Sequence, residues 1–302
     1  MNTILVFGAN GFSGRNFIEY VKNNTDDKLI GFSTEISSAI DIQYFQGSVT
    51  NYKDVNNLLN RTRPDCIINL SGSFSNDYNK DYEVNVSGSK NILDSVLENN
   101  LKKTKILFIG SSAEYGIFGT SHFSENHPLQ PISIYALTKV FQTKLVNYYC
   151  KVHQLNICLV RPSNLIGPNM SNKLFIGNFF DQALKVAFKK MSTITIGNEH
   201  AFRDYIDIRD AVKVYYDLLI MGESSVYNLG TGQVTQIKTI VDITLSKLGI
   251  SRNKVKNKQD SINNGLDYNV LSIKKLEKNL KFKPSYNIEE SIEYLISETR
   301  NG

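Results

Sequence analysis

Short strand-like runs alternate with helical patterns along the first half of the chain. The runs rich in apolar and β-branched residues are TILVFG, KLIGF, CIINLSG, KILFIGSS and NICLVRPSN, and a helical periodicity follows each of the first four. This order predicts an α/β fold with a doubly wound parallel sheet, because helices that connect parallel strands cover both faces of the sheet. The length of 302 residues, 41% of them hydrophobic, suffices for a large core.

The turn after the first predicted strand reads GANGFSG and places Gly8, Gly11 and Gly14 at three-residue spacing. Such a turn leads a strand into a helix, so that backbone amides and the helix N-terminus can face a pyrophosphate. Glycines permit the close approach of the ligand. A glycine triplet alone has little specificity, but its place in the first strand-to-helix turn of an alternating chain favours a dinucleotide site.

The alternating pattern loosens after RPSN. Segment 165–200 and the chain beyond residue 233 look less regular, whereas RDYIDIRDAVKVYYDLLIMG predicts a short strand followed by a helix. We therefore expect an NAD(P)-binding Rossmann domain at 1–164, to which 203–232 partly returns. A smaller, discontinuous substrate-binding cap is expected at 165–202 and 233–302.

Charge and composition exclude several classes of function. The net charge of +5 comes from Lys and Arg spread along helix-like segments and the stretch SRNKVKNKQD, and no basic stripe interleaves with aromatics, so we expect no nucleic-acid partner. No apolar run approaches the roughly 20 residues of a membrane span. The first residues, MNTILVFG, begin a strand at once and show no leader peptide. These features favour a soluble, cytoplasmic protein.

The cysteines and histidines indicate neither a disulfide framework nor a metal site. Cys66 and Cys158 lie inside apolar runs, and Cys66 is far in sequence from both Cys150 and Cys158, so we interpret all three as reduced core residues. The histidines are His122, His127, His153 and His200. They show no metal-ligand spacing with one another or with cysteine. We expect no metal.

The stretch SIYALTK, from Ser133 to Lys139, places a tyrosine and a lysine four residues apart. At that spacing Tyr135 and Lys139 share one face of a helix. Most such pairs on helix surfaces have no chemical role, so the spacing alone does not decide the function of this one.

Together, the glycine spacing, YALTK and the serine pair after KILFIG resemble the extended short-chain dehydrogenase/reductase family, also called the NAD-dependent epimerase/dehydratase family. The resemblance covers nearly the whole chain. Further matching stretches are PDCIINLSG, YEVNVSGSKNIL, IGSSAEYG, RPSNLIGP, GNEHAFRDYIDIRD, YNLGTG and LKFKP. The resemblance implies that the cofactor is contacted by eleven residues, namely Gly8, Asn10, Gly11, Phe12, Gly14, Ser33, Leu70, Ser71, Asn85, Tyr135 and Lys139.

The resemblance also implies the catalytic roles. Tyr135 would exchange a proton with the sugar oxygen while hydride moves at the carbon, and Lys139 would lower the pKa of the phenol and hold the nicotinamide ribose. A phenol needs such help because its ordinary pKa is about 10. Ser111 matches the residue that hydrogen-bonds the reacting oxygen, although a cap at the end of a strand is its structural alternative.

The residues around Tyr115 bear on the type of reaction. Dehydratases of this family carry an acidic residue two places before this tyrosine, where this chain has Ala113. Glu114 lies next to that place and is expected to point elsewhere, so a 4,6-dehydratase is disfavoured. Epimerases need no such acid and are excluded less firmly. The flanking stretches look most like nucleotide-linked 4-keto-6-deoxyhexose reductases, such as GDP-4-keto-6-deoxymannose reductase, which transfer hydride from NAD(P)H to C4.

Ser33 occupies the place after the second strand where NAD-binding chains usually have a carboxylate for the ribose hydroxyls. A carboxylate there would repel a 2′-phosphate, so its absence favours NADPH, with NADH as the alternative. Glu35 is close enough in sequence to reach inward, Ser48 replaces an aspartate that relatives place near the adenine, and no arginine is obviously placed for a 2′-phosphate.

The nucleotide-diphosphate sugar would be bound from the other side of the site. Arg203 matches the family's arginine on the diphosphate, where a planar guanidinium makes paired contacts, and its structural alternative is a salt bridge to Asp204 or Asp207. Ser111, Ser112 and Asn164 match substrate-side polar residues, although Asn164 has a turn at the end of a strand as its alternative. Arg161 also has a structural alternative.

Two other functions compete with a reductase. An epimerase would keep its cofactor tightly bound, and a non-catalytic dinucleotide-binding protein would usually lack the tyrosine or the lysine. We also predict a homodimer, because the helices near residues 85–100 and 135–149 carry apolar residues on more than one face, namely Ile92, Val96, Val140 and Leu145.

Overall fold

The computed structural model describes residues 1–35, 41–116, 122–257 and 268–301. Its centre is a seven-stranded sheet in the order β11-β6-β5-β4-β1-β2-β3. Every pair of neighbouring strands in it is parallel. The strands are β1 (Thr3–Phe7), β2 (Lys28–Ser33), β3 (Gln43–Gln46), β4 (Cys66–Asn69), β5 (Lys105–Ile109), β6 (Ile157–Pro162) and β11 (Val226–Leu229). The order reverses between β1 and β4, so the sheet is doubly wound, and this reversal creates a crevice at the carboxyl ends of the strands.

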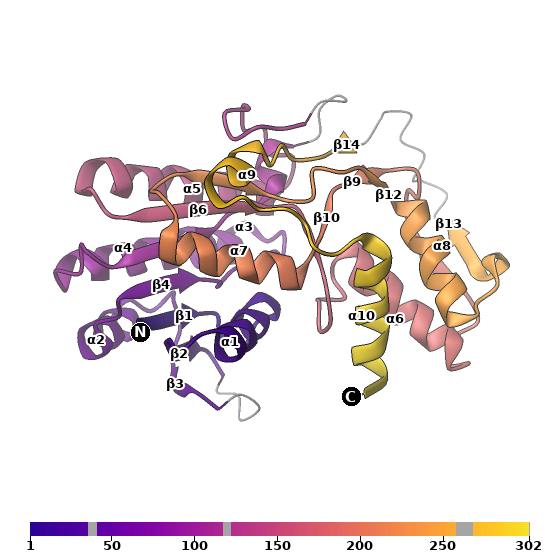
Figure 1. Ribbon diagram of the computed structural model, residues 1–302, viewed down its shortest axis with the longest axis horizontal. Helices are drawn as coiled ribbons and strands as arrows, with labels where there is room; N and C mark the ends of the chain where they lie inside the picture. Colours follow the sequence, from indigo (N-terminus) through magenta and orange to yellow (C-terminus); the bar gives the residue numbers. More distant parts are fainter. Residues whose placement is uncertain (36–40, 117–121, 258–267, 302) are drawn as a thin grey trace.

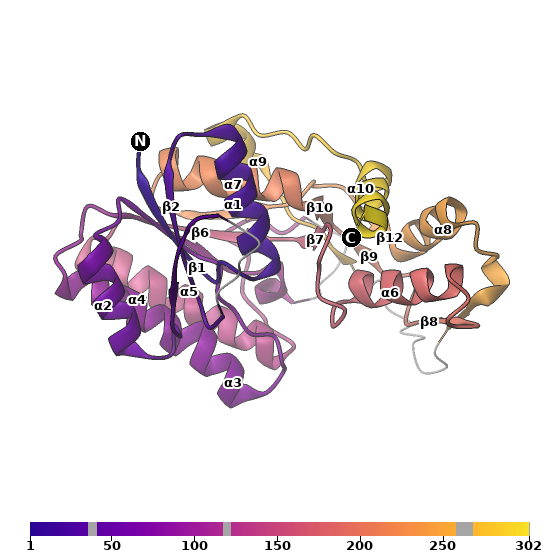
Figure 2. The same cartoon turned by 90° about the horizontal axis from the view of Figure 1, so that it is seen from below.

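Helices cover both faces of this sheet (Figure 2). One face packs against α2 (Tyr52–Thr62), α4 (Gly88–Glu98) and α5 (Ile134–His153), and the other against α1 (Phe12–Asn24), α7 (Ile208–Met221) and α9 (Lys274–Leu280). The strands supply Ile4 and Val6 to one core and Leu5 and Phe7 to the other. Successive side chains of a strand point to opposite faces, so one apolar run builds two cores.

A second group of elements lies beyond the carboxyl ends of the strands (Figure 1). Its helices are α6 (Phe175–Ala187), α8 (Ile237–Leu248) and α10 (Ile288–Asn301). Three small sheets pair β7 (Asn164–Ile166) with β10 (Tyr205–Asp207), β8 (Ile194–Ile196) with β13 (Val255–Asn257), and β9 (Phe202–Arg203) with β12 (Thr235–Gln236) and β14 (Tyr268–Asn269). Two separate apolar clusters hold these elements together.

Four short helices complete the described part of the fold. They are α3 (Tyr78–Tyr82), the π-helical turn η1 (Glu83–Ser87) and the 3₁₀ turns η2 (Ser112–Tyr115) and η3 (Arg252–Lys254). Chain 70–88 runs from the end of β4 through α3 and η1 into α4, and η2 follows β5 directly. Both segments therefore border the crevice at the end of the sheet.

The predicted fold class is confirmed, with two differences. The strand β3 was not predicted, because its sequence QYFQ has no apolar run. This composition fits its place at the edge of the sheet, where it is only partly buried. The expectation that 165–200 and the chain beyond about residue 233 are less regular is wrong, since the first holds α6 and β8 and the second holds α8, α9 and α10. The helix α6 buries Ile176, Phe179, Phe180 and Ala183 at helical spacing. The domain boundary at residue 164 stays a prediction.

Two residues that we offered as a second apolar face belong to the core instead. Ile92 and Val96 are fully buried between α4 and the sheet, while Val140 and Leu145 on α5 are half-buried. A surface for a second subunit therefore cannot include Ile92 or Val96, because both already cover the sheet.

The three cysteines are free thiols, with Cys66 and Cys158 buried in β4 and β6 as expected and Cys150 half-buried. Across the described ranges, no helix is long and apolar enough to cross a membrane.

Gly14 sets the packing of α1 against the turn that precedes it. A Cβ atom at Gly14 would lie 2.3 Å from the carbonyl oxygen of Gly8 and 2.7 Å from that of Ala9. We expect Gly14→Ala to lower the free energy of unfolding by about 1–3 kcal/mol, as overpacking does, in urea titrations. Gly197→Ala is the matched control, because no atom lies within 4 Å of the added methyl. Equal stabilities for the two variants would contradict this account.

Candidate active site

The turn between β1 and α1 brings two backbone segments together at the reversal point of the sheet. Gly8 has φ +75°, and a Cβ there would lie 2.7 Å from the backbone of Leu70 and of Ser71. Only glycine fits such a position. The helix α1 begins after the exposed Gly11, whose N-terminal amides have no side-chain cap. The positive end of the helix dipole is therefore open to an anionic ligand.

Asn10 connects this turn to the end of β2. Its Nδ2 atom donates to the carbonyl oxygen of Glu35, and its Oδ1 atom accepts from the Tyr44 hydroxyl at 3.3 Å. Arg15 Nε donates to the Asn10 carbonyl at 3.0 Å, so an exposed guanidinium lies beside the end of β2. Sequence reasoning missed Arg15, because this placement depends on the fold of the turn. Phe12 and Ser33 are half-buried and Glu35 is exposed.

Asn85 joins the segment after β4 to α5. Its Oδ1 atom accepts from the Ser73 amide at 2.9 Å, and its Nδ2 atom donates to Ser73 O at 2.8 Å and to Thr138 Oγ1 at 3.0 Å. A Cβ at Gly72 would lie 3.5 Å from Asn85 Oδ1 and 3.7 Å from Lys139 Nζ. The turn after β4 therefore lies directly against Lys139.

Asp81 organises the same segment, and sequence reasoning did not identify it. Its buried carboxylate accepts from Ser73 Oγ at 2.6 Å, from Ser75 N and Oγ at 2.9 and 2.7 Å, and from Asn76 N at 3.0 Å. Burial acts to raise the pKa of Asp81, but these hydrogen bonds outweigh it and hold the pKa below its ordinary value. A negative charge is therefore fixed beside the crevice.

The helix α5 presents Tyr135 and Lys139 one turn apart. Ser133 caps it by accepting from the Ala136 amide at 3.1 Å. Lys139 is buried and donates from Nζ to Ile109 O at 2.8 Å and to Gln142 Oε1 at 3.0 Å. Burial lowers the pKa of Lys139 to about 8, although the Glu114 and Asp81 carboxylates act in the opposite direction.

The Tyr135 phenol and the Ser111 side chain form a hydrogen bond. Burial raises the pKa of Tyr135 to about 12, the hydrogen bond with Ser111 opposes this rise, and the charges of Glu114 and Asp81 add to it. The resemblance implied a phenol adjusted toward the phenolate. Here the phenol is held in its protonated form at neutral pH, which is the form that donates a proton.

Ser111 fills the structural role that the sequence offered for its position, and its contact with the reacting oxygen stays a prediction. It is the N-cap of η2, accepting at Oγ from Ala113 N at 3.2 Å, and it also contacts Tyr135. Ser112 is buried. The expectation that Glu114 points elsewhere agrees with its contacts, since its buried carboxylate binds Arg161 Nε at 2.9 Å and Thr143 Oγ1 at 2.7 Å. Arg161 therefore has a structural partner.

Asn164 and Arg203 lie on neighbouring strands. Asn164 is exposed and donates from Nδ2 to Asp204 O at 2.9 Å, while the half-buried Arg203 donates to Phe202 O at 2.8 Å. The carboxylates that we weighed as salt-bridge partners of Arg203 have other donors. Asp204 accepts from Thr231 N at 2.8 Å and Gly232 N at 3.0 Å, and Asp207 pairs with Arg209 at 2.8 Å.

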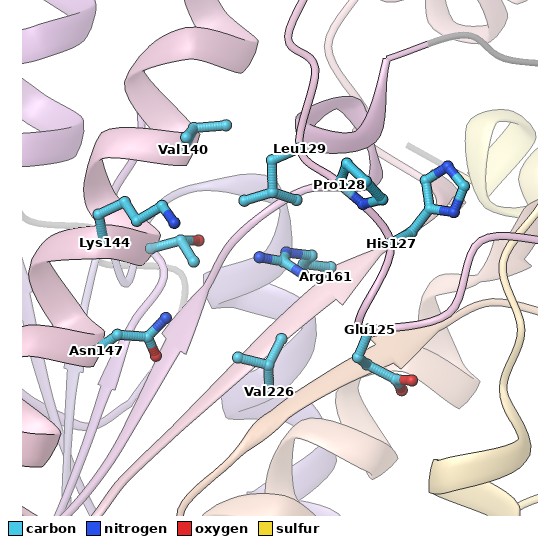
Figure 3. Close-up of a pocket in the computed structure, with 10 residues that line it drawn as sticks. Glu125, His127, Pro128, Leu129, Val140, Lys144, Asn147, Arg161 and Val226 are labelled. Carbon is cyan, nitrogen blue, oxygen red and sulfur yellow. The ribbon is translucent and has the colours of Figure 1, made fainter.

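A pocket of about 330 Å³ lies between α5, β6, β11 and segment 125–129 (Figure 3). Arg161 and Thr143 line it, whereas Ser111, Tyr135 and Lys139 do not. This pocket is therefore distinct from the candidate active site. Among residues whose placement is described, no three His, Cys, Asp or Glu side chains gather to hold a metal ion.

Comparison with known proteins gives a family match over most of the chain. The family model described as GDP-mannose 4,6 dehydratase matches residues 5–295. The chain is also 30% identical to the GDP-6-deoxy-D-talose 4-dehydrogenase of Aggregatibacter actinomycetemcomitans over 268 residues. This aligned region covers 86% of each protein.

Solved structures share the whole fold. The dTDP-glucose 4,6-dehydratase of Bacillus anthracis, in complex with NAD, matches with a TM-score of 0.89 at 20% identity, covering 100% of this chain and 97% of that one. The protein RMD of Pseudomonas aeruginosa, in complex with NADPH, matches with a TM-score of 0.87 at 20% identity, covering 99% and 100%. These likenesses confirm the Rossmann-type architecture.

The pKa of Lys139 makes stability depend on pH. Because the folded pKa is about 8 and the ordinary value is 10.5, the folded state binds fewer protons than the unfolded chain between these values, so stability rises with pH there. We expect the free energy of unfolding of the native protein to gain about 3 kcal/mol relative to Lys139→Met over this range. Denaturant titrations of both proteins at pH 7 to 10.5 measure it. Parallel pH curves would show that Lys139 does not titrate as described.

Proposed function

The chain belongs to the GDP-mannose 4,6 dehydratase family of extended short-chain dehydrogenase/reductases, and we propose that it is a reductase of nucleotide-linked 4-keto-6-deoxyhexoses. It would transfer hydride from NAD(P)H to C4 and release an NDP-6-deoxyhexose. The relative named GDP-6-deoxy-D-talose 4-dehydrogenase supports redox chemistry at C4 of such a sugar.

The observation that carries this proposal is the chemistry around Ser111 and Tyr135. A dehydratase needs an acid beside the sugar, but Ala113 has none and the neighbouring Glu114 is bound to Arg161 and Thr143. A reductase needs a proton donor, and Tyr135 with a raised pKa is protonated at neutral pH. The missing acid disfavours elimination of water, and the protonated phenol meets the requirement of a ketone reductase.

A nicotinamide dinucleotide fits the crevice at the sheet reversal. The uncapped start of α1 at Gly11 would face its diphosphate, and the close approach at Gly8 leaves no side chain in the way. Lys139 would hold the nicotinamide ribose. When bound, the reduced nicotinamide supplies the hydride.

The chain's own residues would handle the proton. The sugar O4 would accept hydrogen bonds from the Ser111 and Tyr135 hydroxyls, and Tyr135 would transfer its proton to O4 as negative charge develops there. The Lys139 ammonium would stabilise the resulting phenolate. Arg203 would bind the substrate diphosphate, with Asn164 and Ser112 on the sugar side.

NADPH is the proposed cofactor, with NADH as the alternative. Ser33 ends β2 without a charge, and the exposed Arg15, bound to the Asn10 carbonyl, brings a cation to the place where a 2′-phosphate would lie. Glu35 is exposed and is held through its carbonyl by Asn10. Solved structures of similar fold hold either cofactor, NADPH in RMD and NAD in the dTDP-glucose 4,6-dehydratase, so the preference rests on Ser33 and Arg15.

An epimerase is the second candidate, because it would need no acid beyond Ser111, Tyr135 and Lys139. A non-catalytic binding role is less favoured, since all three residues are present and the first two are in contact. Incubation with NADPH and GDP-, dTDP-, CDP- and UDP-linked 4-keto-6-deoxy sugars, followed by product analysis, separates the three. A reductase consumes NADPH with these ketones. An epimerase consumes none with them, because C4 of a ketone has no configuration to invert, but it inverts C4 of the matching NDP-6-deoxyhexoses when these are supplied with NAD. A binder does neither.

Tyr135→Phe should abolish reduction while leaving cofactor affinity nearly intact, because it removes only the proton donor. The expected loss in kcat is at least about 100-fold and up to about 10,000-fold. Lys139→Met should instead weaken both turnover and cofactor affinity. Steady-state kinetics and fluorescence titration with NADPH measure the two effects. Near-normal turnover by the phenylalanine variant would show that the pair is an ordinary pair on a helix.

Arg15→Ala should weaken NADPH binding about 10-fold and leave NADH binding unchanged, because only NADPH carries the 2′-phosphate. The NADPH affinity of Arg15→Lys should lie between those of the native protein and Arg15→Ala. Calorimetric titration with both dinucleotides measures this, with Arg252→Ala in the cap as the matched loss of an exposed arginine. If Arg15→Ala weakens the binding of NADH and NADPH equally, Arg15 does not bind the 2′-phosphate.

A homodimer remains part of the proposal, but through different residues. Tyr148 and Val152 on α5 and Tyr82 on α3 are exposed, and Tyr82 packs edge-on against Phe141 of α5. Such an apolar stripe can pair with its copy across a two-fold axis. Light scattering at micromolar concentration should give the mass of a dimer for the native protein and of a monomer for Tyr148→Glu. Phe188 is exposed outside the stripe, so Phe188→Glu should remain a dimer. A native monomer would contradict the proposal.

A further inference from the structure

Glu114 is a buried carboxylate that the proposed reaction does not use. It is fully buried, and each of its three partners comes from a different part of the site. Its Oε1 atom accepts from the Ser111 amide at 2.9 Å, and its Oε2 atom accepts from Thr143 Oγ1 at 2.7 Å and from Arg161 Nε at 2.9 Å. Burial raises the pKa of Glu114 above its ordinary value, and the Arg161 guanidinium and the three donors oppose this rise. The ion pair with Arg161 at 2.9 Å is formed by the ionised carboxylate.

These contacts join two elements that must stay in register. Ser111 follows β5, whereas Thr143 lies on α5, two turns after Tyr135 and one after Lys139. One carboxylate therefore ties the Ser111 backbone to the helix that carries the other two residues. Gly110 makes room for it, since a Cβ there would lie 2.5 Å from Glu114 Oε1.

The counterion is itself held rigidly. Arg161 donates from Nη1 to the Tyr115 hydroxyl at 2.9 Å, and its guanidinium lies 4.9 Å from the centre of the Tyr115 ring. The Tyr115 hydroxyl donates in turn to Asn228 Oδ1 at 2.7 Å, in β11. Figure 3 shows Arg161 reaching from β6 toward α5. A charged pair anchored in this way can fix the position of a neighbouring group.

We propose that Glu114 is a positioning residue for the reduction: it fixes Ser111 relative to Tyr135 and Lys139 and places a negative charge behind them. The inference rests on the proposed function for its effect on turnover, but its electrostatic part does not. Glu114 is fully buried and its carboxylate contacts Ser111, Thr143 and Arg161, so it would act through Ser111 and α5.

The charge has a consequence that a purely structural role lacks. The groups that face Lys139 are the Glu114 and Asp81 carboxylates, the Ile109 carbonyl and the Gln142 amide, and those that face Tyr135 are Ser111, Glu114, Asp81 and the Tyr215 phenol. Both carboxylates raise the pKa of Lys139. Removing Glu114's charge should therefore lower that pKa, so that the ammonium is lost at a lower pH.

Glu114→Gln tests the proposal in two readouts. We expect kcat to fall about 10-fold to 100-fold, in the range for a displaced catalytic group, with KM changed less than about threefold. The Kd for NADPH should rise with pH as Lys139 deprotonates, and this rise should begin at lower pH in the variant. Thr143→Val, which removes a hydrogen bond but no charge, should lower kcat less and leave the pH of the rise unchanged. Glu98→Gln on α4 is the matched distant control, with native values.

Each outcome decides the question. A Glu114→Gln protein with native kcat and an unshifted Kd profile overturns the proposal, and so does an equal shift in Thr143→Val. If Glu114→Gln does not fold, the paired replacement Glu114→Met/Arg161→Met removes both charges together, which proteins often tolerate. Native behaviour of that pair, or failure of both variants to fold, also overturns the proposal, because the role would then be stability alone. A native enzyme that binds NADPH but reduces no keto-sugar would contradict the proposed function, while the Kd profile would still test Glu114.

Discussion

The burial of one ammonium and two carboxylates at the carboxyl end of the sheet is the constraint on which the site depends. Lys139, Asp81 and Glu114 are each nearly inaccessible to water, and each has a set of hydrogen-bond partners. A charged group can be buried only when it is paired or hydrogen-bonded. The backbone of 73–76, the end of β5 and the helix α5 are therefore held where these groups need them, and this arrangement positions Ser111 and Tyr135.

The elements beyond the sheet are tied to the site by a similar device. Asp204, buried between β9 and β10, accepts from Thr231 and Gly232 on the segment after β11. Its own carbonyl accepts from Asn164. One residue thus links three segments that are distant in sequence and carry two of the proposed substrate contacts, Asn164 and Arg203. The stability of these links helps to explain why segments so irregular in sequence form a defined surface.

Local patterns predicted much of this arrangement, whereas contacts between distant residues were not predictable. The alternation of apolar runs, the spacing of the glycines and the four-residue spacing of Tyr135 and Lys139 are local, so the sheet, the first turn and the helix face followed from them. Asp81, Arg15 and Glu114 were missed or set aside, because their partners lie on other elements. Ile92 and Val96 were misassigned because the apolar pattern of α4 does not show which side faces the sheet, and β3 lacks an apolar run because it lies at an edge.

The central claim is that hydride passes from the reduced cofactor to C4 of the sugar and stays there. Incubation with NADPH deuterated at the transferable position of the nicotinamide, and a GDP-linked 4-keto-6-deoxyhexose, followed by NMR and mass analysis of the sugar, tests this directly. The account predicts one deuterium at C4 in each product molecule and one NADPH oxidised for each. A product without deuterium at C4, formed with no net oxidation of NADPH, would contradict it and would identify an isomerising enzyme.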